Sequence, residues 1–309
     1  MKIITLTLSP AFDVHCLTED LRVGHENLAK IIRREAGGKG VNISRALKVN
    51  DTESLSVVLL GSENGDDFEK YLLADGLNSS TITVSGRIRE NITLHTSSGE
   101  ETRISFEGFS ADPSVLDKIR DKLDKIQLDG VFVTLTGRAP SGIDMLHIKN
   151  FLKHLRQRGA RLIIDSRSFS LADLAECSPY LIKPNQEEIS THMGKEISTL
   201  AEAIEAARAI HGQGIENVMI TLGDKGAALV SDNGVWTAIP PRIEAISTIG
   251  AGDSSIAGFL YAVSEELDEG QALRRAVAFG TAACLTEGTL PPRKEDIEKI
   301  NSQIKLNRM

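Results

Sequence analysis

Apolar and polar positions along the C-terminal two-thirds of the chain predict strands and helices in turn. Short apolar runs at 131–135, 161–165, 180–182 and 218–222 have the length and composition of buried strands. Between the first two runs, apolar residues at helical spacing predict a helix within 142–158. Strands that alternate with helices favour a parallel sheet that is covered on both faces. Residues 1–8 have the pattern of a further buried strand.

Two segments, 12–34 and 81–107, do not show this alternation of strand and helix patterns. Within the second, residues 91–96 and 101–106 alternate on either side of Ser97-Ser98-Gly99-Glu100, which is typical of an antiparallel hairpin. We therefore expect 12–34 and 81–107 to form a small β lid. Residues 1–11, 35–80 and 108–309 would form the main domain, and beyond about residue 252 the pattern predicts helices to the end.

The composition of the chain argues against some classes of binding partner. The 309 residues include 43 acidic and 35 basic side chains, and a net charge of -8 disfavours binding to nucleic acid. No apolar run reaches the roughly 18 residues of a membrane span, and the N-terminal stretch is too short for a secretion signal. Cys16, Cys177 and Cys284 show neither metal nor disulfide spacing. We expect a cytoplasmic protein with no nucleic-acid or membrane partner.

The strongest local signal for chemistry is Thr248-Ile249-Gly250-Ala251-Gly252-Asp253, which precedes an amphipathic helix pattern. The glycines let backbone N–H groups converge, and at a helix N-terminus such groups bind anions such as a phosphoryl group. The Asp253 carboxylate can accept the proton of an attacking hydroxyl. The same run also fits a Gly-rich turn in which Asp253 is only a helix N-cap.

Three further motifs can each be either a purely structural turn or cap, or part of a ligand-binding site. Gly37-Gly38-Lys39-Gly40 precedes a helix through Leu47 and is either a ligand-binding turn or a tight turn, without Walker spacing. Asn185 and Glu188 lie three apart at a helix start, which suits either the water shell of Mg²⁺ or a capping box. The run Thr221-Leu222-Gly223-Asp224-Lys225-Gly226 is either a turn over a nucleotide phosphate or a simple β-turn.

In their order along the chain, these motifs resemble those of the phosphofructokinase-B branch of the ribokinase family. They read Gly-Gly-Lys-Gly-x-Asn near residue 40, Lys-Pro-Asn-x-x-Glu near 185, Thr-Leu-Gly-x-x-Gly near 223 and Gly-Ala-Gly-Asp near 253. The opening Thr5-Leu6-Thr7-Leu8-Ser9-Pro10-Ala11-Phe12-Asp13 is similar to the branch with 1-phosphofructokinase, tagatose-6-phosphate kinase and the minor 6-phosphofructokinase. The resemblance covers essentially the whole chain. It implies a ribokinase-like three-layer α/β/α fold with a mostly parallel central sheet, a small β-sheet lid, and the use of ATP and Mg²⁺.

The resemblance also implies a role for each matching position. Asp253 matches the general base, and Gly250, Ala251 and Gly252 match the anion hole. The positions that match substrate contacts are Asp13, Gly37, Gly38, Lys39, Asn42, Arg89 and Arg103. Those that match nucleotide contacts are Lys183, Asn185, Thr221, Gly223, Gly226 and Gly252. Asn185 and Glu188 match the motif that organises Mg²⁺ through water, and carbonyls near Ser247, Ile249, Ala283 and Gly288 match a site for a monovalent cation such as K⁺.

One position departs from the family pattern. Arg138 stands where the family usually has a small Ser beside the substrate phosphate. Because Arg binds phosphate bidentately, we expect Arg138 to contact the substrate; the alternative is that it turns to solvent.

The reaction implied by the resemblance is ATP-dependent phosphorylation of a ketohexose phosphate. It would convert fructose 1-phosphate to fructose 1,6-bisphosphate, or tagatose 6-phosphate to tagatose 1,6-bisphosphate. The alternatives are a kinase of an unphosphorylated sugar or nucleoside on the same fold, and a non-catalytic sugar-phosphate binding protein. We also expect a homodimer formed through the lid.

Overall fold

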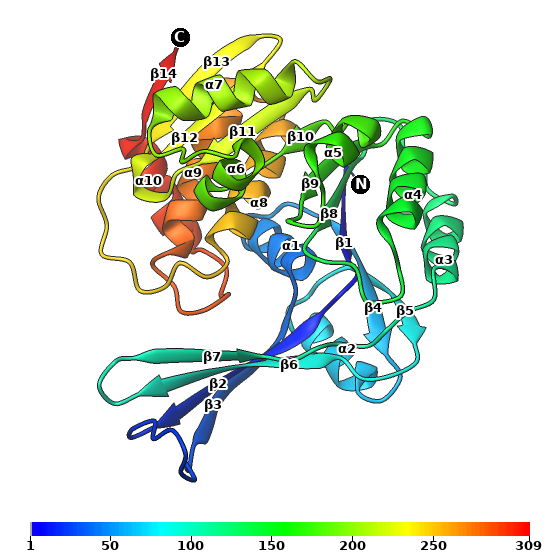
Figure 1. Cartoon of the computed structure of the whole chain (residues 1–309), viewed down its shortest axis with the longest axis vertical. Coiled ribbons are helices and arrows are strands. Elements are labelled where there is room, and N and C mark those ends of the chain that lie inside the picture. The colour runs from blue at the N-terminus through cyan, green and yellow to red at the C-terminus, as the bar shows by residue number, and fades with distance from the viewer. Residues whose placement is uncertain (1) are drawn as a thin grey trace.

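A computed structural model describes residues 2–309 and contains two separate sheets (Figure 1). The large sheet has ten strands in the order β14-β13-β12-β11-β10-β9-β8-β1-β4-β5. Its strands are β1 (Ile3–Thr7), β4 (Leu55–Gly61), β5 (Ser79–Val84), β8 (Phe132–Thr136), β9 (Arg161–Asp165), β10 (Leu181–Ile182), β11 (Asn217–Thr221), β12 (Ala227–Ser231), β13 (Gly234–Ile239) and β14 (Lys305–Arg308). All pairings from β11 to β5 are parallel, whereas β12, β13 and β14 add antiparallel strands at one edge.

Helices cover both faces of the large sheet. The α-helices within residues 2–309 are α1 (Lys39–Val49), α2 (Gly65–Ala74), α3 (Ser114–Leu123), α4 (Met145–Gln157), α5 (Leu171–Cys177), α6 (Gln186–Met193), α7 (Leu200–His211), α8 (Ala251–Ser264), α9 (Glu269–Ala283) and α10 (Lys294–Gln303). Alternate strand residues belong to different cores: Ile163 packs with α1, α8, α9 and α10, whereas its neighbour Ile164 packs in the core that includes α3, α4 and α7. The two-residue period of a strand therefore produces the three layers.

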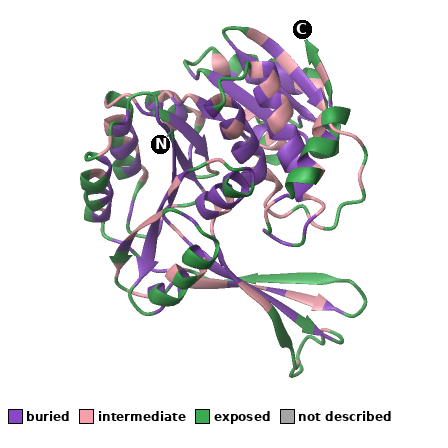
Figure 2. Ribbon diagram, turned by 180° about the vertical axis from the view of Figure 1, so that it is seen from behind, coloured by how far each residue is buried: buried purple, intermediate pink, exposed green. Residues whose placement is uncertain are grey.

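The small sheet projects from the large one (Figures 1 and 2). It has the order β3-β2-β6-β7, with strands β2 (Ala11–Thr18), β3 (Lys30–Gly37), β6 (Arg89–Thr96) and β7 (Glu101–Ser105). Strands β6 and β7 form the antiparallel hairpin expected from the sequence. We call this four-stranded sheet, with the β2–β3 connection, the lid.

The three-layer α/β/α architecture with a small β sheet is confirmed, with differences at the edges. Residues 81–84, expected in the lid, belong to β5 of the large sheet, and residues 35–37, expected in the main domain, belong to β3 of the lid. The chain after residue 252 does not stay helical, because β14 follows α10 and pairs with β13. Over residues 2–309, no helix combines the length and the apolar character that a membrane span needs.

Candidate active site

A cleft of about 1300 Å³ lies at the carboxyl edge of the large sheet and extends to the lid. Strand ends supply much of its wall, including Thr7 of β1, Thr136 of β8, Asp165 of β9 and Thr221 of β11. This edge is where ligands bind in parallel α/β sheets. Every residue expected to act in catalysis or to bind substrate, nucleotide or Mg²⁺ lines the cleft except Gly37; of the four positions expected near a monovalent cation, only Ile249 lines it. A Cβ atom at Gly37 would overlap the Asp13 carboxylate, so this glycine makes room for a residue that does line the cleft.

The N-terminus of α8 points its first turn into the cleft. Gly250 has φ of 79°, a left-handed conformation that suits glycine, and it precedes the first helical residue, Ala251. The first N–H groups of a helix lack the hydrogen bond to a carbonyl one turn earlier. In α8, the Ala251 N–H makes only a long hydrogen bond of 3.4 Å to Thr248 O. Gly252 and Asp253 follow on the same turn, so their N–H groups are placed to receive an anion.

Asp253 is 6% exposed and accepts a hydrogen bond of 2.9 Å from Asn42 Nδ2. Burial raises the pKa of Asp253 to about 6, and nearby Lys39 and the Asn42 hydrogen bond limit the rise. The carboxylate is therefore ionised at neutral pH yet basic enough to accept a proton.

A buried carboxylate between two lysines lies beside Asp253. Asp165, at the end of β9, is 2.8 Å from Lys39 Nζ and 3.4 Å from Lys183 Nζ. Burial alone would raise the pKa of Asp165, but the two ammonium groups outweigh it and lower the pKa. Burial lowers the pKa of Lys39, but the nearby carboxylates of Asp165 and Asp253 outweigh burial and raise it. The ammonium of Lys39 and the carboxylate of Asp165 therefore both stay charged. No local motif marks Asp165 in the sequence, and its only signal is its place at a strand end.

At the lid end of the cleft, a single acid lies among basic groups. Asp13 Oδ1 accepts from Asn91 Nδ2 at 2.9 Å and is 3.4 Å from the Arg103 guanidinium. Arg89 donates to Ser9 Oγ at 3.1 Å. Arg138, an exposed residue, also lines the cleft there. Burial is the main cause that lowers the pKa of Arg89, and the positive charge of Arg138 is the second. The guanidinium groups of Arg89 and Arg138 are therefore close enough to repel each other.

The start of α6 has the geometry of a capping box. Asn185 Oδ1 accepts from Glu188 N at 2.9 Å, and Glu188 Oε2 accepts from Asn185 N at 3.0 Å. The Glu188 carboxylate also accepts from Arg167 at 2.9 Å, a contact the sequence did not reveal. Between residues 2 and 309, no group of three His, Cys, Asp or Glu side chains is placed to hold a metal directly. The donors present fit a Mg²⁺ ion that keeps its water shell.

The opposite end of the cleft suits a nucleotide. Thr221, Gly223 and Gly226 lie at the end of β11 and in the turn that follows it. The cleft is also lined by segments that are richer in apolar residues and include Pro240, Pro241, Ile243, Ala245, Val277 and Cys284, together with the polar Arg242 and Thr281. A wall of this kind can enclose a flat base while the glycine turn faces phosphates.

Comparison with known proteins agrees with this arrangement. The model of the pfkB family carbohydrate kinases matches residues 8–296. The 1-phosphofructokinase of Escherichia coli K12 is 33% identical over 91% of this chain and 90% of its own length. That of Bacillus subtilis 168 is 29% identical over 99% of this chain and 100% of its own length.

Solved structures give the same result. Phosphofructokinase-2 from Escherichia coli, in complex with potassium, has a TM-score of 0.91 and 26% identity over 98% of both chains. A tetrameric inhibited form of the same protein has a TM-score of 0.88 and 25% identity over 98% of both chains. A family match over nearly the whole length, with the Gly-Ala-Gly-Asp turn and the basic lid in one cleft, shows that this chain belongs to the pfkB family of carbohydrate kinases.

Proposed function

We propose that this kinase transfers the γ-phosphoryl group of ATP to a hydroxyl of a ketohexose phosphate, fructose 1-phosphate or tagatose 6-phosphate. The observation that carries the proposal is one cleft with Asp253 at the N-terminus of α8 and three arginines at the lid end: Arg89, Arg103 and Arg138. The name 1-phosphofructokinase, given to relatives 28–33% identical, favours the fructose substrate.

Asp253 is the proposed general base. Its carboxylate takes the proton of the attacking hydroxyl as that oxygen bonds to the γ-phosphorus and the bond to the ADP oxygen breaks. The N–H groups of Gly252 and Asp253 stabilise the negative charge of the phosphoryl oxygens, while Asn42 orients the base. Lys39 and Lys183, held by Asp165, add positive charge beside the path of transfer.

The arginines are the proposed site of the substrate's own phosphate. Within residues 2–309, the hydrogen-bond partners of these three guanidinium groups are Ser9 and Asp13, so around a neutral sugar the three charges would stay largely unpaired. A phosphate would pair them through charge-assisted hydrogen bonds. Arg138 takes part as an additional phosphate ligand in place of the usual small Ser.

Two ions complete the proposal. Asn185 and Glu188 would order the water shell of Mg²⁺, which neutralises charge on the nucleotide phosphates when it is bound. Carbonyls near Ser247, Ile249, Ala283 and Gly288 would hold K⁺. The two chain segments that carry them are side by side, since Ile246 N donates to Cys284 O at 2.8 Å, and the structural relative was crystallised with potassium.

The lid is the proposed dimer interface. Its strands and the β2–β3 connection expose the large apolar residues Leu17, Val23, Leu28, Ile31, Ile32 and Ile104, and Phe106, directly after β7, is exposed as well. Figure 2 shows the exposed stretches along these strands. Apolar surface on a small sheet with open edges favours pairing with a second copy.

The experiment is a product-resolved ATP-turnover assay with fructose 1-phosphate, tagatose 6-phosphate, fructose 6-phosphate, free fructose, free tagatose, ribose and a nucleoside. We expect the bisphosphate of one of the first two substrates to form fastest. Faster turnover of a free sugar or nucleoside would contradict the proposed substrate class. Binding of sugar phosphates without any turnover would instead indicate a non-catalytic binding protein.

A further inference from the structure

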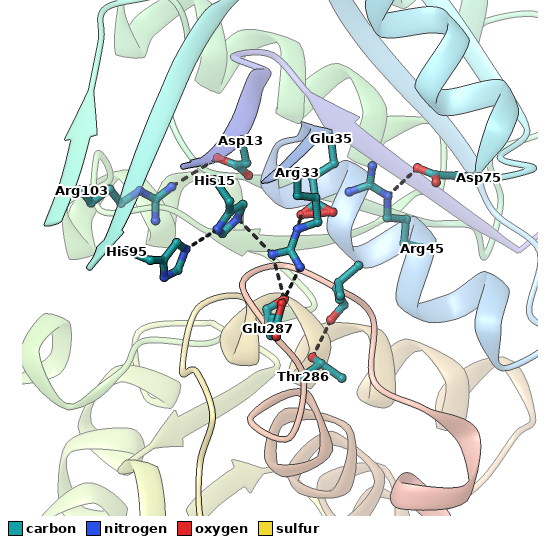
Figure 3. Close-up of polar contacts among 11 residues, drawn as sticks. Asp13, His15, Arg33, Glu35, Arg45, Asp75, His95, Arg103, Thr286 and Glu287 are labelled. Atoms are coloured by element: carbon teal, nitrogen blue, oxygen red, sulfur yellow. Dashed lines mark hydrogen bonds and ion pairs between the residues drawn. The ribbon is translucent and has the colours of Figure 1, made fainter. Parts of the chain in front are cut away.

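A polar contact joins the lid to the loop behind the anion hole, away from the groups used in the proposed reaction. Arg33 of β3 donates to Glu287 Oε2 at 3.1 Å and approaches Glu287 O at 3.4 Å (Figure 3). Glu287 lies in the loop between α9 and α10. The contact therefore connects two segments that are 254 residues apart in the chain.

The Arg33 side chain is held in place from both sides within the lid. Arg33 Nε is 3.2 Å from the carboxylate of Glu35, which is 9% exposed, and its terminal NH2 group is 3.1 Å from His15 Nε2. The Arg33 side chain is only 22% exposed, whereas that of Glu287 is 73% exposed. An isolated ion pair with so exposed a partner contributes little to stability. The Arg33 guanidinium is already oriented by Glu35 and His15, so it loses less side-chain entropy when it pairs with Glu287.

The donors fix the direction of a hydrogen-bond chain across all four lid strands. Because an Arg guanidinium can only donate, His15 Nε2 must accept and its proton must be on Nδ1. His15 Nδ1 then donates to His95 Nε2 at 2.9 Å, and His95 Nδ1 faces Glu101 Oε1 at 3.1 Å. Burial, reinforced by the charge of Arg33, lowers the pKa of His15, which agrees with a neutral ring. The chain thus links β3, β2, β6 and β7 and ends at Glu287.

The loop at the far end of this chain touches the anion hole. A Cβ atom placed on Gly250 would lie 3.6 Å from Thr289 Cα and 3.9 Å from Gly288 O. Gly288 packs more closely still against the lid, since a Cβ atom there would be 2.6 Å from the Arg33 guanidinium and 2.9 Å from the His15 ring. The loop is held in shape by the buried Thr286 hydroxyl, which lies 2.8 Å from Ala283 O and 2.9 Å from Leu290 O. The lid, the 284–290 loop and Gly250 therefore lie next to one another, with no room for a larger side chain at Gly288.

The same lid strands carry the sugar end of the site. His15 and Asp13 are two residues apart on β2, so their side chains lie on one face of the strand. Asp13 is bonded to Asn91 of β6 and contacts Arg103 of β7. Any tilt of the lid relative to the loop would move Asp13 and Arg103 relative to Asp253.

We propose that Arg33, His15 and Glu287 form a latch that fixes the lid against the 284–290 loop, so that the sugar site and the anion hole keep one relative position during transfer. None of the three lines the cleft, so they are positioning residues rather than catalytic ones. The inference rests on the proposed sugar-phosphate kinase activity. Its consequence is a fixed distance between the attacking hydroxyl and the γ-phosphate, and closer exclusion of water from ATP.

The experiment compares Arg33→Met, Glu287→Ala and the double variant with wild type, and uses Lys30→Met as the matched control. Lys30 is an exposed residue of the same strand β3 and forms no ion pair within residues 2–309. We expect Arg33→Met to raise the KM for sugar phosphate roughly fivefold or more, with the KM for ATP nearly unchanged. The ratio of ATP hydrolysed to sugar phosphorylated should also rise. The double variant should be little worse than Arg33→Met, because both changes break one contact.

A latch would be ruled out if both single variants, after correct folding is verified, kept the wild-type KM for sugar phosphate and the wild-type ratio of hydrolysis to transfer. Arg33→Met can fail to fold because Glu35 loses its partner. In that case Glu287→Ala alone tests the latch, since the Glu287 side chain is largely exposed and its removal leaves the fold intact.

Hydrogen–deuterium exchange separates failure of the latch from failure of the proposed function. Both variants should exchange faster than Lys30→Met in β2, β3 and residues 284–290, whatever sugar the enzyme accepts. Unchanged exchange in those segments would overturn the latch. A wild-type enzyme that phosphorylates no sugar phosphate would overturn only the proposed function.

Discussion

At the scale of single residues, Asp253 shows how burial and hydrogen bonding together set a chemical property. Burial in the first turn of α8 disfavours the carboxylate, while Lys39 and Asn42 favour it, and the pKa settles at about 6. In Asp253→Asn the group can no longer take a proton. We expect kcat to fall roughly 10²–10⁴-fold with little change in ATP affinity, measured by turnover and by nucleotide titration. Activity within about threefold of wild type would remove Asp253 from the role of base.

The same carboxylate predicts a pH dependence. With a pKa raised to about 6, the Asp253 carboxylate is half protonated near that pH, and the protonated form cannot act as a base. The value of kcat/KM should therefore be level at neutral pH and fall as pH drops through about 6, approaching tenfold per unit below it. A profile of kcat/KM that stays flat to about pH 5 would contradict this assignment.

The residues missed from the sequence share a physical cause. Asp165 and Arg167 lie at and just after the end of β9, where a strand delivers side chains to the cleft, but no local motif marks them. Their partners Lys39, Lys183 and Glu188 are distant in sequence, so only folding brings the charges together. By contrast, Gly250–Asp253 could be predicted because the glycines and the following helix are contiguous.

At the scale of elements, the buried parallel strands could be predicted well and the sheet edge could not. The run at 161–165 coincides with β9, because its central residues 162–164 are buried on both faces of the sheet and are therefore apolar. The hairpin β12–β13 and the final strand β14 were absent from the sequence analysis. Strand β14, with the sequence Lys-Leu-Asn-Arg, is mostly exposed and forms through its pairing with β13.

Helix α6 offers a test of two roles for one motif. The capping box of Asn185 and Glu188 is present, and Glu188 also lines the cleft. If Glu188 orders the water of Mg²⁺, Glu188→Gln should raise the Mg²⁺ concentration needed for half-maximal rate. Gln at this position can still form a capping box, so unfolding should shift only slightly. An unchanged Mg²⁺ dependence would leave Glu188 only the capping role.

At the scale of the whole molecule, the lid contributes to both substrate binding and association. One part of it supplies Asp13 and Arg103 to the cleft, while elsewhere it exposes Ile31, Ile32 and Phe106. We expect a homodimer in sedimentation at micromolar concentration, because apolar area of this kind tends to be covered. Replacement of Ile31 and Phe106 by Ser should shift the equilibrium toward monomer. A wild-type protein that sediments only as monomer would contradict the interface.

The proposed reaction requires a substrate that carries a phosphate before the reaction begins. Arg89, Arg103 and Arg138 come from separate chain segments of an acidic protein and meet at one end of the cleft. Pairing these charges should stabilise the phosphorylated substrate through at least two charge-assisted contacts.

The most direct measurement is kcat/KM for fructose 1-phosphate and for free fructose, in wild type and in Arg103→Ala. We predict a wild-type preference for the phosphorylated sugar on the order of 10²-fold or more, and loss of much of it in Arg103→Ala with little change for free fructose. Equal or faster use of free fructose by the wild-type enzyme would contradict the account.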